Sequence, residues 1–229
     1  MSAPTTLQIA IDGPAASGKT TVAHRLARRL RILYLDTGAM YRALAYLALQ
    51  TRTDIDNESA LVRLCEGQHV RVVLDASAPL GFRIFVDARE LDEMILQSNE
   101  VTAIVSTIAT HPGVREAMVR SQRRVANDGP VVMAGRDIGT VVLPNAAVKV
   151  FLTASTQARV SRRRAQLEAA GVDVNVHQLS QEIEERDRLD RSRAVSPLVP
   201  APDAHVIDSS TMNADDVVGE IITIVERLG

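Results

Sequence analysis

Short apolar runs alternate with longer stretches of helical periodicity along most of the chain. Apolar runs bounded by polar or turn residues are typical of buried strands. Between them, apolar positions recur every three or four residues, as Val22, Leu26 and Leu30 do, which predicts helices with one buried face. Strands that alternate with helices favour an α/β fold whose parallel sheet is covered on both faces. The predicted strands are 7–11, 32–36, 131–134, 148–153 and 204–208, and the predicted helices are 20–31, 43–50, 97–109, 112–127, 155–170 and 213–228.

Two segments depart from this alternation. In residues 69–91, two stretches have an apolar residue at every second position, which predicts a small antiparallel element inserted into the main domain. Residues 181–197 are dense in charges of both signs, which is typical of a helix with a solvated face. We expect Val176, Leu179 and Ile183 to form the inward face of that helix.

The composition fits one soluble domain. The chain has 229 residues, 46% of them hydrophobic, and a net charge of −2, which argues against binding of a nucleic acid polymer. The longest apolar run, 43–49, is far too short to cross a membrane, and the N-terminus has no leader-peptide pattern. The single cysteine, Cys65, excludes an intrachain disulfide and fits a reducing compartment. We therefore expect a cytoplasmic protein, and a monomer because no long apolar surface stripe is evident.

Residues 13–20 read GPAASGKT and fit the pattern G-x-x-x-x-G-K-[ST] of a loop that binds nucleotide phosphates. Gly13 and Gly18 let backbone N–H groups converge on anionic oxygens, and the following helix adds its positive N-terminal dipole. Lys19 is expected to bridge the β- and γ-phosphates of ATP, and the Thr20 hydroxyl to bind Mg²⁺. The predicted strand before this phosphate loop and the helix after it supply the context that the motif requires.

Further polar residues follow other predicted strands. Ligands of open parallel sheets bind at the carboxyl ends of the strands, so DTGAMYR (36–42) and GRD (135–137) should lie beside the phosphate loop. The chain lacks the N-K-x-D of GTPases, and GRD stands where mechanical ATPases have Asp-Glu. Because arginine binds phosphate bidentately, Arg42 and Arg136 indicate an acceptor that is itself a phosphate ester.

Arginines also recur at helical spacing later in the chain. Arg186, Asp190 and Arg193 fall at i, i+4 and i+7, along one stripe of a helix. Arg159 and Arg163 lie one turn apart in the preceding predicted helix. Phosphoryl transfer requires neutralised charge and exclusion of water, and a mobile arm of arginines that closes over two phosphates would supply both.

Six stretches of the chain form an ordered set: IAIDGPAASGKTT (9–21), LDTGAMYRA (35–43), HPGVREAM (111–118), GRDIGTVVLP (135–144), ERDRLDRSRAVSPL (185–198) and APDAHVIDSS (201–210). Through them the chain resembles the bacterial cytidylate kinases over essentially its whole length. The resemblance implies one domain, 1–229, with the three-layer αβα fold of P-loop NTPases and a five-stranded parallel sheet. It implies a core of 5–36, 111–170 and 200–229, a monophosphate-binding part at about 37–110 that includes the insertion 69–91, and an Arg-rich helical lid at about 171–199.

The reaction that this resemblance implies is transfer of the γ-phosphate of ATP to CMP or dCMP with Mg²⁺, with UMP a poor acceptor. Arg136, Arg193 and Arg42 would face the acceptor phosphate, and Asp190 would bind the ribose hydroxyls. The implied catalytic residues are Lys19, Arg136, Arg186 and Arg193; the donor site is Gly13, Pro14, Ala15, Ala16, Ser17, Gly18, Lys19, Thr20, Thr21, Arg159 and Arg163; the acceptor site is Thr37, Tyr41, Arg42, Ser106, Arg115, Arg136, Asp137, Asp190 and Arg193.

The chemistry of the base fits this assignment. Cytosine offers an N4 donor beside N3 and O2 acceptors, so Asp137 can accept from N4 while Arg115 and Ser106 donate to the ring. Two other functions stay open: a kinase for another small phosphorylated metabolite, and a regulatory or nucleic-acid-binding module that uses ATP as a switch. A panel of acceptors separates the first, and binding without phosphoryl transfer marks the second. The chain departs from the family pattern at Ala134, where an acidic residue is usual, and at Leu189, where a basic one is common.

Overall fold

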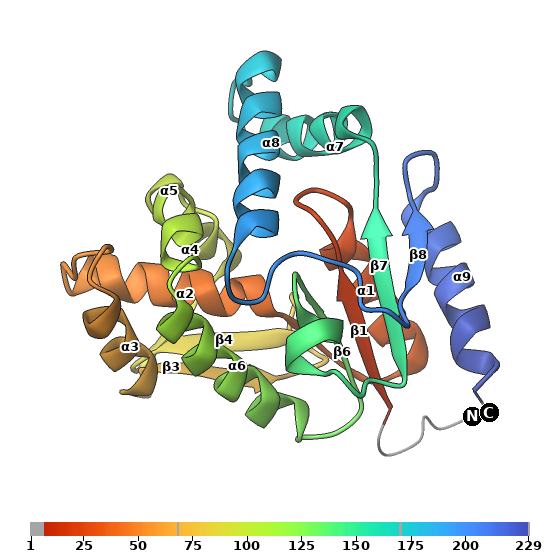
Figure 1. Cartoon of the computed structure of the whole chain (residues 1–229), viewed down its shortest axis with the longest axis horizontal. Helices are drawn as coiled ribbons and strands as arrows, with labels where there is room; N and C mark the ends of the chain where they lie inside the picture. The colour runs from red at the N-terminus through yellow and green to blue at the C-terminus, as the bar shows by residue number, and fades with distance from the viewer. Residues whose placement is uncertain (1–6, 68, 170, 229) are drawn as a thin grey trace.

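The computed structural model describes residues 7–67, 69–169 and 171–228. Its centre is a five-stranded sheet with the strand order β2-β6-β1-β7-β8, in which neighbouring strands are parallel (Figure 1). The sheet confirms the predicted α/β fold. The central strands are almost completely buried, which explains why they are continuous apolar runs in the sequence. The strands are β1 (Gln8–Asp12), β2 (Leu33–Asp36), β6 (Val131–Gly135), β7 (Val148–Thr153) and β8 (His205–Asp208).

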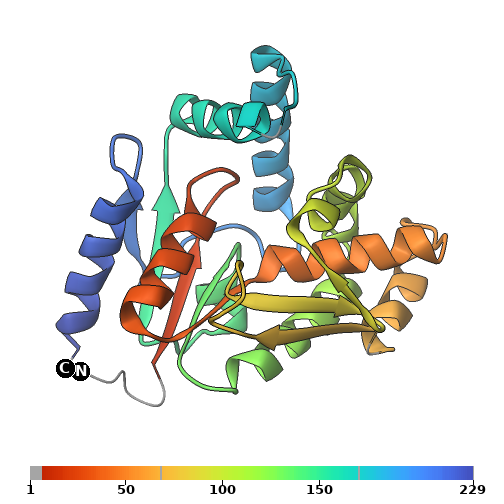
Figure 2. The same cartoon turned by 180° about the vertical axis from the view of Figure 1, so that it is seen from behind.

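Helices cover both faces of this sheet. α1 (Lys19–Leu30) and α9 (Ala214–Glu226) pack against each other on the face that is in front in Figure 2. α6 (Pro112–Ala126) and the π-helical turn η1 (Ile138–Val142) lie on the opposite face, toward the viewer in Figure 1. Within the described residues, no helix is both long enough and apolar enough to cross a bilayer.

A second, smaller sheet lies between α2 (Thr37–Gln50) and α6. Its strands β3 (Val70–Leu74), β4 (Phe82–Val86) and β5 (Arg89–Leu91) are antiparallel, which confirms the element predicted at 69–91. The buried side chains of this sheet belong to the same apolar core as those of the main sheet. The insertion therefore packs as an extension of the main core.

Two helical regions differ from the sequence prediction. α3 (Glu58–Glu66) is not predicted; it is only nine residues long, and Leu61 is its single buried residue. The helix predicted at 97–109 is confirmed as α5 (Asn99–Ile108), and a short helix that is not predicted, α4 (Glu93–Leu96), precedes it. Asp92 and Ser98 each accept a backbone N–H from three residues further on, so each starts a new helix.

α7 (Thr156–Ala169) and α8 (Val176–Ser192) stand beyond the carboxyl ends of the strands (Figure 1). They pack on each other through a small cluster of Val160, Leu179 and Ile183, separate from the main core. The expected inward position of Val176 is wrong: this first residue of α8 is 43% exposed, because the helix begins before its apolar stripe meets α7. The α7–α8 pair thus has little apolar contact to hold it.

Gly13, at the turn out of β1, lies where no side chain fits. Its φ is +152°, and a Cβ there would lie 2.0 Å from the carbonyl oxygen of Leu152 on β7. The phosphate loop can therefore run beside β7 only because residue 13 lacks a Cβ.

We expect Gly13→Ala to lower the free energy of unfolding by at least about 2 kcal/mol, because backbone atoms must move to relieve the clash. Urea denaturation measures this quantity. Gly219→Ala on α9 is the matched control, since a Cβ there meets nothing within 4 Å. Alanine is the better helix former, so the control should leave stability unchanged or raise it by up to about 1 kcal/mol. Equal effects of the two substitutions would contradict the close approach.

Candidate active site

The phosphate loop brings a buried lysine to the carboxyl end of β1. Lys19 is 7% exposed, and its ammonium donates hydrogen bonds to the carbonyl of Pro14 (2.6 Å) and the hydroxyl of Ser17 (3.4 Å). Burial lowers the pKa of Lys19 well below its ordinary value, and the nearby Arg136 lowers it further. Neutral oxygens do not compensate this buried positive charge, so the loop is organised to receive an anion.

Asp36, the last residue of β2, organises the neighbouring edge of the sheet. Its carboxylate accepts the N–H of Gly38 (2.9 Å) and so caps α2. The same carboxylate accepts a hydrogen bond from the hydroxyl of Thr20 (3.3 Å) and lies 3.9 Å from the guanidinium of Arg42. The loop, the start of α2 and one acceptor arginine therefore meet at this carboxylate.

Thr20 and Asp36 form an oxygen pair that fits Mg²⁺. Magnesium in nucleotide enzymes is usually held by one or two protein oxygens, with phosphates and waters as the other ligands. No group of three or more His, Cys, Asp or Glu side chains with metal-binding geometry occurs in the described ranges, and magnesium bound with a nucleotide needs none.

A buried aspartate that the sequence analysis did not single out fixes the loop after β6. Asp12, 5% exposed at the end of β1, accepts hydrogen bonds from the N–H groups of Ile138 (2.8 Å) and Gly139 (2.7 Å). Burial raises the pKa of Asp12 to about 6, although both N–H groups favour the ionised form. Asp12 thereby locks the phosphate loop to the GRD segment. Its signal in the sequence is a polar residue at the end of an otherwise apolar strand.

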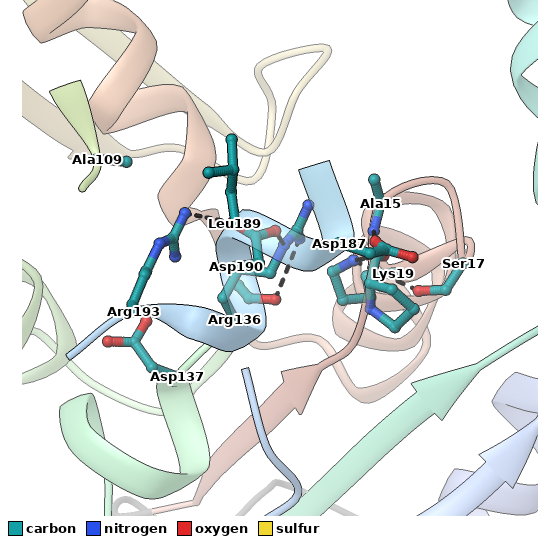
Figure 3. A network of polar contacts seen from close by, with 12 residues as sticks. Ala15, Ser17, Lys19, Ala109, Arg136, Asp137, Asp187, Leu189, Asp190 and Arg193 are labelled. Atoms are coloured by element: carbon teal, nitrogen blue, oxygen red, sulfur yellow. Dashed lines mark hydrogen bonds and ion pairs between the residues drawn. The ribbon is translucent and has the colours of Figure 1, made fainter. Parts of the chain in front are cut away.

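Asp190 on α8 draws two arginines together. Its carboxylate accepts from Nε of Arg136 (2.7 Å) and also pairs with Arg193 (Figure 3). Burial by itself would raise the pKa of Asp190, but Arg136 and Arg193 hold it below its ordinary value. The stripe of Arg186, Asp190 and Arg193 predicted from the sequence is thus joined, through Asp190, to Arg136, the residue that follows β6.

Positive charge is in excess around this carboxylate. Arg186, half-buried one turn before Asp190, has its pKa lowered to about 10 by burial and by the nearby Arg136 and Arg42. Burial and Arg42 also lower the pKa of Arg163. Like charges held this close raise the free energy of the empty site, and a ligand that carries several negative charges would relieve the repulsion.

A buried ion pair lies at the other end of the cluster. Arg115 of α6 and Asp137, whose side chains are 2% and 7% exposed, are joined at 2.7 Å. Arg115 also donates to the carbonyl of Ala109 (3.3 Å), one turn after Ser106 on α5. The ring of Tyr41 lies 5.7 Å from the Arg115 guanidinium. A donor and an acceptor are thus fixed side by side, as recognition of a base edge requires.

Comparison with known proteins identifies the family. The model of the family described as cytidylate kinase matches residues 9–227. The chain belongs to the cytidylate kinase family. A cytidylate kinase of Geobacillus sp. (strain WCH70) is 48% identical over 224 residues, 97% of this chain and 98% of the relative, and one of Pelotomaculum thermopropionicum is 50% identical over 214 residues, 93% of each. The chain is therefore a kinase, a phosphotransferase.

The chain is also similar to part of a longer protein and to a solved structure. A bifunctional pantoate ligase/cytidylate kinase of Synechococcus sp. (strain JA-2-3B'a(2-13)) is 46% identical over 96% of this chain, which matches 40% of that longer protein. A solved structure of an uncharacterized protein from Eubacterium ventriosum shares the fold with a TM-score of 0.53 and 13% identity, over 96% of this chain and 98% of that one.

Most of the predicted positions converge in the structure. Thr37 donates to the carbonyl of Ala134 (2.9 Å) at the sheet edge, and Thr21 is exposed on α1 next to Thr20. Ser106 lies on α5, three residues before Ala109, and makes no hydrogen bond to the Arg115–Asp137 pair among the described contacts. The roles of these residues stay predictions.

The arginines of α7 differ most from the sequence picture. Arg159 pairs with Asp187, and Arg163 reaches Gln166 of its own helix (3.5 Å). Arg162, which the i, i+4 spacing does not select, donates to the carbonyls of Ser17 (3.2 Å) and Ser209 (2.5 Å) and holds the phosphate loop. The run of consecutive arginines at 162–164 was the available signal, but sequence spacing does not say which of them faces the loop.

We expect Arg115→Met to lower the free energy of unfolding by about 3–5 kcal/mol, because it leaves the carboxylate of Asp137 buried without its partner. Arg120→Met is the matched control on the same helix, since its pair with Glu66 has side chains 53% and 56% exposed. An exposed pair contributes about 0–1 kcal/mol. Denaturant unfolding measures both variants, and a loss for Arg115→Met no larger than that for the control would show that the pair is not a buried charge pair in solution.

Proposed function

We propose that this kinase transfers the γ-phosphate of ATP to CMP or dCMP, giving CDP or dCDP, with Mg²⁺. The observation that carries the proposal is that the guanidinium groups of Arg136 and Arg193 lie between Lys19 and Asp137 (Figure 3). Asp137 is itself the partner of the buried Arg115. One end of this row suits the phosphates of the nucleotide that supplies the phosphate. The other end suits a base that has a hydrogen-bond donor next to a hydrogen-bond acceptor. A nucleoside monophosphate is an acceptor that carries both a phosphate and a base.

On the donor side, the N–H groups of the phosphate loop and the ammonium of Lys19 would bind the β- and γ-phosphates. The hydroxyl oxygen of Thr20 would bind Mg²⁺ directly. Asp36 already accepts the hydrogen bond that this hydroxyl donates, which would leave the oxygen lone pairs of Thr20 free for the metal. Bound Mg²⁺ neutralises charge on the donor phosphates. Arg163 would add charge from α7.

On the acceptor side, Arg42, Arg136 and Arg193 would bind the phosphate of the monophosphate. Asp190 holds Arg136 and Arg193 in position before the ligand arrives, and it would then bind the ribose. Because the contact of Asp190 with the ribose would not depend on the 2′-hydroxyl alone, dCMP would also be an acceptor.

The transfer itself needs no nucleophile from the protein. An oxygen of the acceptor phosphate would attack the γ-phosphorus in line, while Lys19, Arg136, Arg186 and Arg193 stabilise the charge on the transferring group. Closure of the lid, which contains α8, would exclude water, so that the phosphate passes to the monophosphate. Proximity and orientation of the two phosphates would provide much of the rate enhancement.

The architecture supports a division into three parts. The core would comprise 5–36, 111–170 and 200–229, the monophosphate-binding part about 37–110, and the lid about 171–199. The protein would act as a monomer in the cytoplasm on small nucleotides, without a membrane or a nucleic acid polymer as partner.

A panel of acceptors tests the proposal. Release of ADP from ATP and Mg²⁺ should be fast with CMP and dCMP, weak with UMP, and near background with AMP and GMP. Lys19→Ala should lower turnover by about 10²-fold or more, since the transferring phosphate loses its buried cation. Arg29→Ala, exposed on the same helix, should match the wild type. Turnover with none of these acceptors would refute the assignment and favour another metabolite or a switch.

Asp137 is expected to decide between cytosine and uracil. Asp137→Asn should lower the ratio of kcat/KM for CMP over UMP by about tenfold, because the carboxylate that accepts from N4 becomes an amide that can also donate to O4. Asp203→Asn, which changes the partner of the buried Lys149 outside this site, is the matched control and should leave the ratio unchanged. A variant of Asp137 that stays active with an unchanged ratio would remove this residue from base recognition.

A further inference from the structure

A second buried ion pair joins the α7–α8 pair to the phosphate loop. Asp187 of α8 and Arg159 of α7, 7% and 5% exposed, lie 2.5 Å apart. The carboxylate of Asp187 also accepts the N–H of Ala15 (3.4 Å), and Arg159 donates to the carbonyl of Ala15 (3.2 Å). Both backbone polar groups of one loop residue are therefore bound by one ion pair (Figure 3 shows Asp187 beside Ala15).

The charge of Arg159 is already matched by a carboxylate, although its Nε has no hydrogen-bond partner within the described residues. Its guanidinium donates to Asp187, to Ala15 and to the hydroxyl of Thr156 (3.4 Å). A buried arginine that is already matched by a carboxylate has little charge left for an anion. Lys19, by contrast, has only neutral hydrogen-bond acceptors in the same loop.

Asp187 lies on α8 between two residues of the candidate site. Asp187 directly follows Arg186 and precedes Asp190 by three residues. Fixing Asp187 therefore sets the rotation of α8 about its own axis and its position along that axis, and with them the place of Asp190, which pairs with Arg136. The apolar contact between α7 and α8 is small and separate from the main core. The ion pair is thus a specific link through which the position of α8 depends on the conformation of the phosphate loop.

We propose that Arg159 and Asp187 are positioning residues that couple placement of the α8 arginines to the phosphate loop. They do so by clamping Ala15, and Arg159 does not bind the donor phosphates. When the clamp is formed, Arg186 and the Asp190 pair stand over the site; when it breaks, α8 and the loop loosen together. The kinetic half of the proposal rests on the proposed function, whereas the structural half is independent of any substrate.

The structural half is tested by hydrogen exchange on the full-length protein without nucleotide. Asp187→Asn and Arg159→Gln should each speed exchange by at least about fivefold both at residues 13–18 and along α8, because loss of the clamp lets the two segments open locally. Glu185→Gln is the matched control, since it breaks the exposed pair with Arg188 on the same helix. It should leave exchange at residues 13–18 unchanged. Faster exchange of α8 without a change in the loop would overturn the coupling.

The kinetic half separates positioning from phosphate binding. Each variant should lower kcat by about 10- to 100-fold, the scale of a misplaced catalytic group, with KM for ATP changed less than about threefold. The double variant should be no slower than the worse single variant, because the two residues act as one unit. A KM for ATP raised by about tenfold in Arg159→Gln alone would make Arg159 a donor ligand and overturn the proposal. If the wild type phosphorylates none of the acceptors, the proposed function fails while the exchange experiment still decides the clamp.

Discussion

The constraint on which this structure depends is the repulsion among positive charges gathered at one edge of a sheet. Lys19, Arg136 and Arg186 lie close enough to lower the pKa of Lys19 and Arg186. A site for two phosphorylated ligands needs this concentration, yet the empty protein must fold with it. Residues that serve the ligand thus cost stability, which the rest of the fold must offset.

Carboxylates at the ends of elements supply much of that compensation. Asp12 ends β1, Asp36 ends β2, and Asp190 lies near the end of α8. Each accepts two or more hydrogen bonds or ion pairs, and each connects elements that are far apart in the chain. The same carboxylates therefore reduce the repulsion and set the geometry of the site.

The two parts of the site differ in how firmly they are held. The Arg115–Asp137 pair is almost completely buried, and α6, which carries Arg115, packs on the main apolar core through Val114 and Met118. The α7–α8 pair has its own small apolar cluster and is tied to the core chiefly by polar contacts. Elements of low local stability are the ones that move on ligand binding. Under the proposed function, a firmly held recognition site and a charged arm that closes would together exclude water from the transfer.

The sequence by itself determined the parts of the protein that depend on neighbours along the chain. The phosphate loop is readable because Lys19 bonds to Pro14 and Ser17 within one octet, and the α/β alternation follows from local periodicity. The short helix α4 was within reach too, since Asp92 is a local capping residue. Only the tertiary structure decided which distant groups meet: Asp12 with Ile138, and Asp187 with Ala15. Those pairings depend on strand order and helix rotation, which arise from packing of the whole chain and leave no spacing in the sequence.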